Sequence, residues 1–349
     1  MRIMFVYWAF QDQGSGLLIN GYTRAAQEMN HEVVVYGRPI PNIPLNYSLD
    51  VDSADALVFI FEWTTSLLNG DNLDFVRLSK IPRRRTVILD GDGNYNDLIA
   101  VEGDYNHRDE SSRDRWIAIC NSLSDKICQP TMQPLRPNVR SFLFYCYNPA
   151  WELPLAMDEK EFGMLYVGNS KYRWPAMSRL LRSVESVRQR VGRIGIIGHG
   201  WNALPAWARF MDMESAYCTD SQYMRSLGVE FLPPVPFDQV ICSMNKAVFN
   251  PVLTRPTFNH MRFVTPRYFE TPAAGTIPLF LVEPEHVSDI YGKAALELVL
   301  PDNRPEDKIQ DIFDRPGLYA EVTNDIRAHL SNYHTQQARL KQLIEIIES

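Results

Sequence analysis

Short runs of uninterrupted apolar residues, each followed by an amphipathic segment, constrain the fold of this chain most strongly. In the amino-terminal part these runs cover residues 3–8, 33–36, 56–61 and 86–89. Their lack of polar alternation is typical of parallel strands that helices cover on both faces. Between the first two runs, apolar residues recur every three or four positions from Leu18 to Met29, which predicts a helix with one buried face. This order of elements predicts a doubly wound α/β domain.

The same order begins again near residue 162. Strands are predicted at 162–167, 194–197, 229–232, 247–250, 277–282 and 297–300. Pro175 suits the first turn of a helix whose apolar positions run from Met177 to Val187, and Gly192 suits its end. The sequence therefore predicts an α/β protein with two tandem doubly wound, Rossmann-like domains that face a cleft.

The predicted domain boundaries follow from a connection rich in Pro and charge at residues 147–163. We place an amino-terminal Rossmann-like domain at 1–155 and a carboxyl-terminal Rossmann-like domain at 156–325. Residues 326–349 repeat apolar side chains near heptad spacing and predict one amphipathic helix. This helix could cross back and pack against the amino-terminal domain.

Charge, cysteine content and the length of apolar segments limit which binding partners and which cellular compartment the sequence predicts. The net charge of −7 and the pI of about 5.6 disfavour nucleic acid and anionic lipid as partners. The five cysteines show no CxxC or Cys/His spacing, which predicts reduced thiols in a cytoplasmic protein and neither a zinc site nor a disulfide framework. The apolar stretch at residues 3–10 is too short to span a membrane, so no transmembrane segment is predicted.

Each predicted domain sends a glycine-containing loop from its first strand into the next helix. The first loop holds Gly14, Ser15 and Gly16, and the second reads VGNSKYR, from Val167 to Arg173. Such loops let backbone N–H groups approach an anion at a helix N-terminus. Neither loop matches a P-loop or a GxGxxG motif. Each is alternatively an ordinary tight turn, but their matching places in two facing domains favour a ligand role.

The order of motifs in the second half resembles a known family. The stretches FGMLYVGNSKYRW, IGIIGHGW, GVEFLPPVPFDQVICSMNKAVFNPV, TPRYFETPAAGTIPLF and YHTQQARLKQLIEII are similar to the carboxyl-terminal half of group-1, CgeB-like (spore-maturation-protein) glycosyltransferases. The resemblance spans about residues 162–347 and is densest at PRYFETPAAGTIPL. It implies the two-domain GT-B fold, with a nucleotide-sugar donor bound by the domain at 156–325 and the acceptor bound by the domain at 1–155.

The resemblance also implies roles for individual residues. Glu270 is expected at a helix start, where its carboxylate would accept hydrogen bonds from ribose or sugar hydroxyls. A helix-terminal acid that only complements the helix dipole is the alternative. Many retaining members carry a second acid where this chain has Arg262, which could instead pair with the donor diphosphate. The predicted donor-binding residues are Gly14, Ser15, Gly16, Gly168, Asn169, Lys171, Arg173, His199, Pro236, Arg262, Arg267 and Glu270.

A catalytic base for the acceptor hydroxyl is expected in the amino-terminal domain. We predict Asp12 and Asp92 for this role, ahead of Glu62 and Asp90, because all four follow strand ends. Asp12 is alternatively a cap of the first glycine loop. Asp90 and Asp92 also form the Asp-x-Asp pattern by which GT-A transferases hold Mg²⁺ or Mn²⁺. We predict a metal-independent enzyme, because a GT-A enzyme would not need the second nucleotide-binding half.

The sequence thus predicts a glycosyltransferase without a cofactor that moves a sugar from a nucleoside-diphosphate sugar to a glycan, lipid or small-molecule acceptor. A nucleic-acid acceptor is disfavoured by the acidic balance. The alternatives are a sugar-nucleotide epimerase or a phosphorylase on the same fold, or a catalytically inactive GT-B-like binding or surface-assembly protein.

Overall fold

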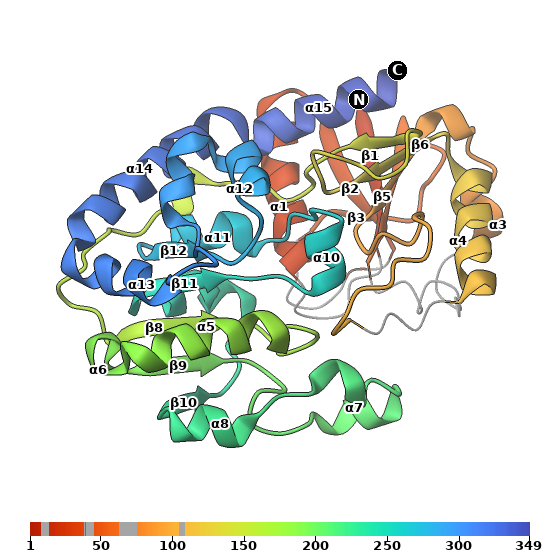
Figure 1. Cartoon of the computed structure of the whole chain (residues 1–349). Helices are drawn as coiled ribbons and strands as arrows, with labels where there is room; N and C mark the ends of the chain where they lie inside the picture. Colours follow the sequence, from red (N-terminus) through yellow and green to blue (C-terminus); the bar gives the residue numbers. More distant parts are fainter. Residues whose placement is uncertain (8–13, 38, 40–44, 63–74, 105–108) are drawn as a thin grey trace.

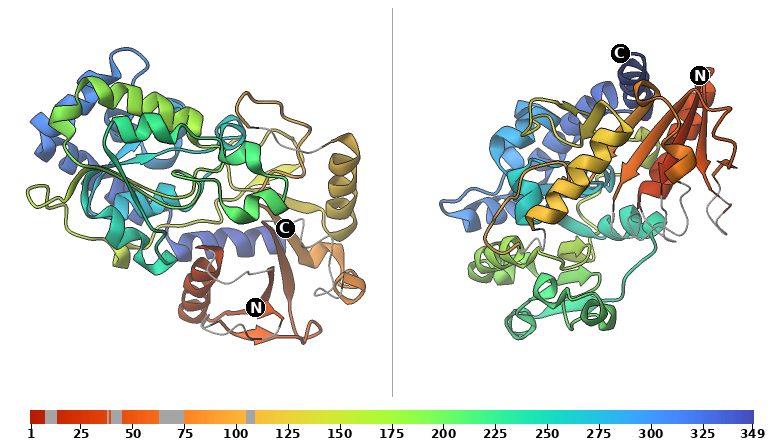
Figure 2. Two further views of the ribbon diagram at one scale, coloured as in Figure 1. Left: turned by 90° about the horizontal axis from the view of Figure 1, so that it is seen from below. Right: turned by 90° about the vertical axis from the view of Figure 1, so that its right-hand side faces the viewer.

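Two separate parallel β-sheets organise the computed structural model of the chain (Figure 1). The structure describes residues 1–7, 14–37, 39, 45–62, 75–104 and 109–349. Figure 2 shows that the sheets belong to two bodies of different orientation, joined by the connection near residue 150. The predicted α/β class with two doubly wound halves is confirmed.

The amino-terminal sheet has seven parallel strands in the order β3-β2-β1-β4-β5-β6-β7. The strands are β1 (Arg2–Tyr7), β2 (Glu32–Tyr36), β3 (Tyr47–Ser48), β4 (Ala56–Phe61), β5 (Thr86–Asp90), β6 (Lys126–Gln129) and β7 (Val139–Ser141). The helical segments are α1 (Gly14–Glu28), α3 (Phe75–Leu78), η1 (Arg83–Arg85) and α4 (Glu110–Leu123). Alternate residues of β1 pack toward α1 on one face and α4 on the other, so both faces are buried.

The carboxyl-terminal sheet has five parallel strands in the order β10-β9-β8-β11-β12. They are β8 (Phe162–Val167), β9 (Ile194–Ile197), β10 (Val229–Leu232), β11 (Ala247–Val252) and β12 (Ile277–Phe280). The strand predicted at 297–300 was wrong. Its first two residues belong to the 3-10 helix η5 (Lys293–Leu298), and Val299 makes an isolated bridge to Phe280 at the sheet edge.

Helices cover both faces of this second sheet. The face that carries Met164 and Tyr166 packs against α5 and the helices near the end of the chain, and the opposite face packs against α9. The helical segments are η2 (Pro149–Trp151), α5 (Trp174–Ser186), α6 (Arg188–Val191), α7 (Ala206–Phe210), η3 (Glu214–Tyr217), α8 (Ser221–Ser226), η4 (Phe237–Gln239), α9 (Val240–Met244), α10 (Pro256–His260), α11 (Arg267–Ala273), α12 (Pro284–Tyr291) and α13 (Pro305–Asp314).

The end of the chain forms two helices where the apolar spacing predicted one. They are α14 (Pro316–Tyr333) and α15 (Gln336–Glu348), and the chain turns at His334 between them. Thr335 caps α15, because its side chain accepts a hydrogen bond from the Ala338 N–H at 3.3 Å. The break lets α15 leave the second sheet and lie along α1 in the amino-terminal half (Figure 1).

The two sheets turn their carboxyl edges toward each other. In each sheet the strand order reverses beside its first strand, and ligands of doubly wound sheets bind at that point, outside the carboxyl ends. Segments that follow β6 and β11 meet across the boundary: the Val264 N–H donates to the Pro130 carbonyl at 2.7 Å. Asn96 likewise donates to the Met261 sulfur at 3.1 Å.

Two further findings concern the thiols and the membrane. All five cysteines are free: Cys120, Cys128 and Cys146 are buried, and Cys218 and Cys242 are exposed. Within the described residues, no helix combines the length and apolar character that crossing a membrane requires.

Candidate functional site

The loop after β8 lies at the point where the order of the second sheet reverses. It interlocks with the loop after β9: the Gly168 N–H donates to the Ile197 carbonyl at 2.8 Å, and the Ser170 N–H donates to the His199 carbonyl at 2.9 Å. A Cβ atom on Gly198 would overlap the Gly168 carbonyl, and Gly198 has a φ of +144°. Glycine is therefore required for the two loops to approach this closely.

This interlocking changes the expected role of the loop. Sequence reasoning assigned the N–H groups of 168–170 to the donor phosphates, but those of Gly168 and Ser170 already have backbone acceptors. Trp201 is a core residue: it is 1% exposed and donates its indole N–H to the Gly168 carbonyl at 2.7 Å.

Side chains of this loop supply cations instead. Arg173 donates to the Asn169 side chain at 2.7 Å and to the Lys171 carbonyl at 3.2 Å, which fixes the shape of the loop. Burial, together with nearby Arg255 and Arg173, lowers the pKa of Lys171 to about 8, while Asp92 and Asp104 oppose the shift. Lys171 is therefore within electrostatic range of cations of its own domain and of carboxylates of the other.

Helix α11 brings Arg267 and Glu270 to the same strand end. Arg267 Nε donates to the carbonyl of Val167, the last residue of β8, at 2.8 Å. The same guanidinium forms an ion pair with Glu270, and the side chains are only 20% and 14% exposed. Glu270 lies in the first turn of the helix, as predicted. A carboxylate and a guanidinium thus lie side by side at the point where the strand order of the sheet reverses.

The end of α11 also shows why small residues follow Glu270. Gly275 has a φ of +68°, and a Cβ atom there would lie 2.5 Å from the Pro154 carbonyl. The Leu153 N–H donates to the Ala273 carbonyl at 2.8 Å, and Arg327 donates to the Pro272 carbonyl at 2.8 Å. The connection between the two halves is therefore held against the end of α11.

On the amino-terminal side, Asp90 is part of the scaffold. It is fully buried and accepts hydrogen bonds from the N–H groups of Asn94 and Tyr95 and from the Gln129 side chain, at 2.8 to 2.9 Å. Burial raises the pKa of Asp90, and these hydrogen bonds offset part of that rise. Asp90 therefore closes the turn after β5, and this turn carries Asp92 in the wall of a cavity.

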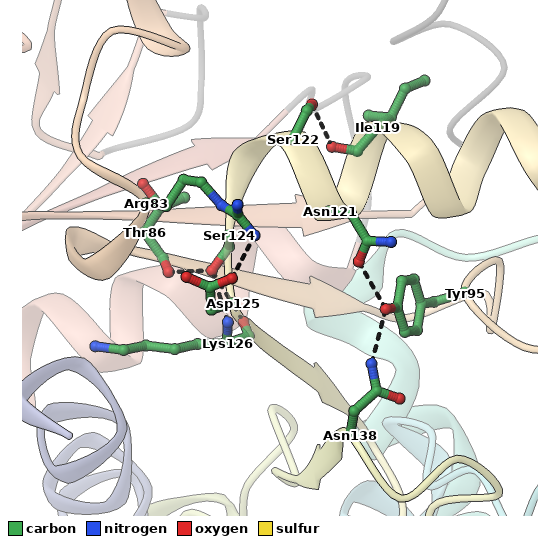
Figure 3. A network of polar contacts seen from close by, with 10 residues as sticks. All are labelled: Arg83, Thr86, Tyr95, Ile119, Asn121, Ser122, Ser124, Asp125, Lys126 and Asn138. Carbon is green, nitrogen blue, oxygen red and sulfur yellow. Dashed lines mark hydrogen bonds and ion pairs between the residues drawn. The ribbon is translucent and has the colours of Figure 1, made fainter.

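Tyr95 anchors this turn to two other elements, as Figure 3 shows. Its hydroxyl donates to Asn121 of α4 at 2.7 Å and accepts from Asn138 at 2.8 Å. Arg136 donates to the Tyr95 carbonyl at 2.9 Å and lies 4.8 Å from the ring centre. The segment with Asp92 is thus held by contacts on three sides.

An ion pair fastens this segment to the carboxyl-terminal half. Arg255, in the loop after β11, donates to both oxygens of Asp104 at 2.8 and 2.5 Å, and the Thr257 N–H donates to the same carboxylate at 3.0 Å. The Asp104 side chain is fully buried, and the guanidinium lies 4.5 and 5.2 Å from the rings of Tyr172 and Phe258. Burial raises the pKa of Asp104, but Arg255 and Thr257 outweigh it and the net shift is downward.

Other predicted residues lie apart from this cluster. Arg262 has a φ of +52° and pairs with Glu283 and Glu285 at 3.0 and 2.6 Å, so its charge is already matched by carboxylates. Pro236 is exposed after β10, two strands from β8, and the side chain of His199 is exposed.

The first glycine loop is described only in part. Asp12 lies outside the described residues. Gly14, Ser15 and Gly16 form the beginning of α1, which places this helix N-terminus at the carboxyl edge of the first sheet.

Glu62, an alternative base, follows β4 at the reversal point of the first sheet and accepts a hydrogen bond from the hydroxyl of Tyr145.

Sequence reasoning missed Asp104, Arg255 and Tyr145. Arg255 carried a usable signal, because it follows a predicted strand and precedes Pro256 at a helix start. Asp104 carried none, since its partner is 151 residues away.

The fold and this arrangement define the class: the chain has the GT-B fold. Among solved structures it is similar to BGT of phage T4 in complex with UDP and Mn²⁺, with 14% identity, full coverage of both chains and a TM-score of 0.56. It is also similar to an α-glucosyltransferase in complex with UDP and a 13-mer DNA, with 13% identity, full coverage of both chains and a TM-score of 0.64.

A third similar structure is a DNA-modifying β-glucosyltransferase with and without uridine diphosphoglucose, at 13% identity, full coverage of both chains and a TM-score of 0.58. Identities this low show the shared fold alone. Neither a protein-family model nor a curated protein sequence matches the chain. Membership of the CgeB-like family therefore stays a prediction.

Proposed function

We propose that this protein is a glycosyltransferase that moves a sugar from a nucleoside-diphosphate sugar to a hydroxyl of an acceptor. The observation that carries the proposal is the pair Arg267–Glu270 at the end of β8, at the point where a doubly wound sheet binds its ligand. The structural neighbours bound to UDP or uridine diphosphoglucose support a donor of this kind.

In this proposal the carboxyl-terminal half holds the donor. Glu270 accepts hydrogen bonds from hydroxyl groups of the donor, because a carboxylate forms charge-assisted bonds with paired hydroxyls. Arg267, Lys171 and Arg173 stabilise the negative charge that grows on the departing diphosphate.

The amino-terminal half supplies the base. Asp92 faces the cation Lys171 across the boundary and lines a cavity, which suits a group that takes the proton from the acceptor hydroxyl. Asp90 does not share this role, since three N–H donors already occupy its carboxylate. We also propose that the reaction is metal-independent, with Arg267, Lys171 and Arg173 taking the place of a divalent ion at the diphosphate.

The test is release of the nucleoside diphosphate from UDP-, GDP-, ADP- and TDP-sugars, with EDTA, in the presence of an acceptor library. We expect turnover with one donor, and we expect Asp92→Asn to lower kcat by about 100-fold or more without changing donor affinity. The control is Asp114→Asn, an exposed acid of α4 that does not line the cavity.

Three other results would redirect the proposal. Conversion of the donor sugar without transfer would indicate an epimerase. A strict need for inorganic phosphate would indicate a phosphorylase. Absence of nucleotide binding in a folded protein would indicate an inactive binding protein.

A further inference from the structure

The cavity beside Asp92 has a composition that the proposed donor site does not explain. It measures about 490 Å³ and lies between residues 92–104 of the amino-terminal half and helix α10 of the other half. Pockets of 300 to 1,000 Å³ are typical of small-molecule sites. The candidate base Asp92 forms part of its wall, so a molecule in the cavity would reach the reacting centre.

The charges of the wall all have one sign. Four of the described lining residues are carboxylates, Asp92, Asp97, Glu102 and Asp104, and none of the described lining residues is Lys, Arg or His. Arg255 balances Asp104 from behind. The side chain of Asp97 is 79% exposed, and its nearest described cation, on Arg136, lies at 4.0 Å. The rim formed by Asp97 and Glu102 therefore repels anions and attracts cations.

The remaining wall is apolar. Leu98, Ile99, Ala100 and Val101 follow one another between the two rim acids, and Met261 of the other half completes the surface. Leu98 is 40% exposed, although exposure of a large apolar side chain to water is unfavourable. A ligand with an apolar body would cover it.

We propose that this cavity takes the acceptor, and that the acceptor is a small hydroxyl-bearing molecule with an apolar body and an amine cation. This inference rests on the proposed function and names its second substrate. The hydroxyl lies at Asp92, the apolar body contacts 98–101 and Met261, and the ammonium group lies at the Asp97–Glu102 rim. A polyanion such as DNA is excluded by the same rim.

The transfer step balances with groups already named. The acceptor hydroxyl gives its proton to the Asp92 carboxylate, and its oxygen forms a bond to the anomeric carbon. The bond from that carbon to the diphosphate oxygen breaks, and its electron pair leaves with the nucleoside diphosphate. Cations on the donor side stabilise the departing charge, so a cationic acceptor does not compete for them.

The test measures, by saturation-transfer NMR, the binding of three matched probes and one DNA duplex to the UDP-saturated protein. The probes are octyl glucoside, octyl glucosaminide, which carries an amine, and octyl glucoside 6-phosphate. We expect the amine to bind about five- to tenfold more tightly than the neutral probe, from two exposed charge pairs, and the phosphate and DNA not to bind.

The double variant Asp97→Lys/Glu102→Lys should reverse this order and leave UDP affinity unchanged. Its control is Asp158→Lys/Glu159→Lys, which changes the net charge equally on the exposed connection between the halves and should keep the wild-type order. Equal binding of amine and phosphate probes, binding of DNA, an order unchanged by the rim variant, or no probe binding despite normal UDP binding would overturn the inference. Failure of UDP itself to bind would instead contradict the proposed function.

Discussion

Removal of the Arg255 guanidinium should loosen the boundary between the two halves. In Arg255→Met the aliphatic stem still lies by the rings of Tyr172 and Phe258, but Asp104 loses its cation and, among the described residues, keeps Thr257 as its hydrogen-bond donor. The Asp104 side chain is fully buried and that of Arg255 is 17% exposed, so water screens the pair little.

The magnitude follows from two independent estimates. Two charges about 4 Å apart interact by about 4 kcal/mol at an effective dielectric constant of about 20. Breaking a buried pair by removing one partner costs about 3–5 kcal/mol. Because Arg255 is slightly exposed, we expect the lower end, about 3 kcal/mol, as the loss in the free energy of opening this contact.

Native-state hydrogen exchange of the Thr257 amide measures that opening directly, since its N–H donates to Asp104 at 3.0 Å. A loss of about 3 kcal/mol corresponds to a fall in protection of more than about 100-fold. The amide of Leu165, in the middle of β8, should keep its protection. The matched variant is Arg304→Met, whose pair with Asp307 is exposed and should contribute less than about 1 kcal/mol.

A double-mutant cycle completes the design. Asp104→Asn alone leaves Arg255 without its charge partner, and the double variant Asp104→Asn/Arg255→Met should be less unstable than the sum of the two. We expect a coupling of about 2 kcal/mol between these contacting residues. Thr257 protection within threefold of wild type in Arg255→Met, or additivity within about 0.5 kcal/mol, would refute the reasoning.

Three further predictions follow from buried groups and close packing. Burial lowers the pKa of His286 to about 4 and that of His334 to about 3, against 6.5 when unfolded, so the unfolded chain binds more protons between these values. The stability is present above pH 6.5 and should fall by about 2 kcal/mol per histidine between pH 7.5 and 5, measured by denaturant unfolding; a flat profile would contradict it. Gly198→Ala should weaken UDP affinity at least about tenfold, whereas Gly317→Ala, with open space at its Cβ, should not, and equal affinities would argue against the interlocked loops. Because the pKa of Lys171 is about 8, donor affinity should fall as the pH rises from 7 to 9, and Lys171→Met should lose this dependence in calorimetric titration; a persisting slope would assign it to another group.

Most strands of both sheets could be predicted from the sequence because they are buried on both faces. The runs at 56–61 and 162–167 match β4 and β8 residue for residue. Strand β6 (Lys126–Gln129) was missed because it begins and ends with polar residues. The Lys126 ammonium donates to the Ile347 carbonyl at 2.5 Å, and Gln129 donates to Asp90. Such partners belong to distant segments, and no local pattern reveals them.

The end of the chain shows a second limit of pattern reasoning. The apolar period continues through His334 and Thr335 because both α14 and α15 bury one face. The period therefore could not show that the two faces pack on different halves. Thr335, a residue type that often caps a helix N-terminus, was the available signal for a second helix, but a single capping residue is a weaker signal than an apolar period that continues past it.

The site divides in the same way. Glu270 and Arg267 could be placed because the motif around them is local and dense. The pairing of Asp104 with Arg255 depends on how two domains meet, which neither segment encodes by itself. The position of Glu270 at a helix start was thus predictable, but the ion pair between Asp104 and Arg255 across the boundary was not.

Calorimetric titration of UDP, GDP, ADP and TDP into wild type, Glu270→Gln and Glu285→Gln tests the central claim most directly. Glu285 is the matched control, because it also lies in a first helical turn and pairs with an arginine, but away from β8. The account predicts binding of one diphosphate, a loss of about 10- to 100-fold in Glu270→Gln from charge-assisted hydrogen bonds, and less than about a twofold change in Glu285→Gln. Undiminished binding in Glu270→Gln, or no binding of any diphosphate to the wild type, would contradict it.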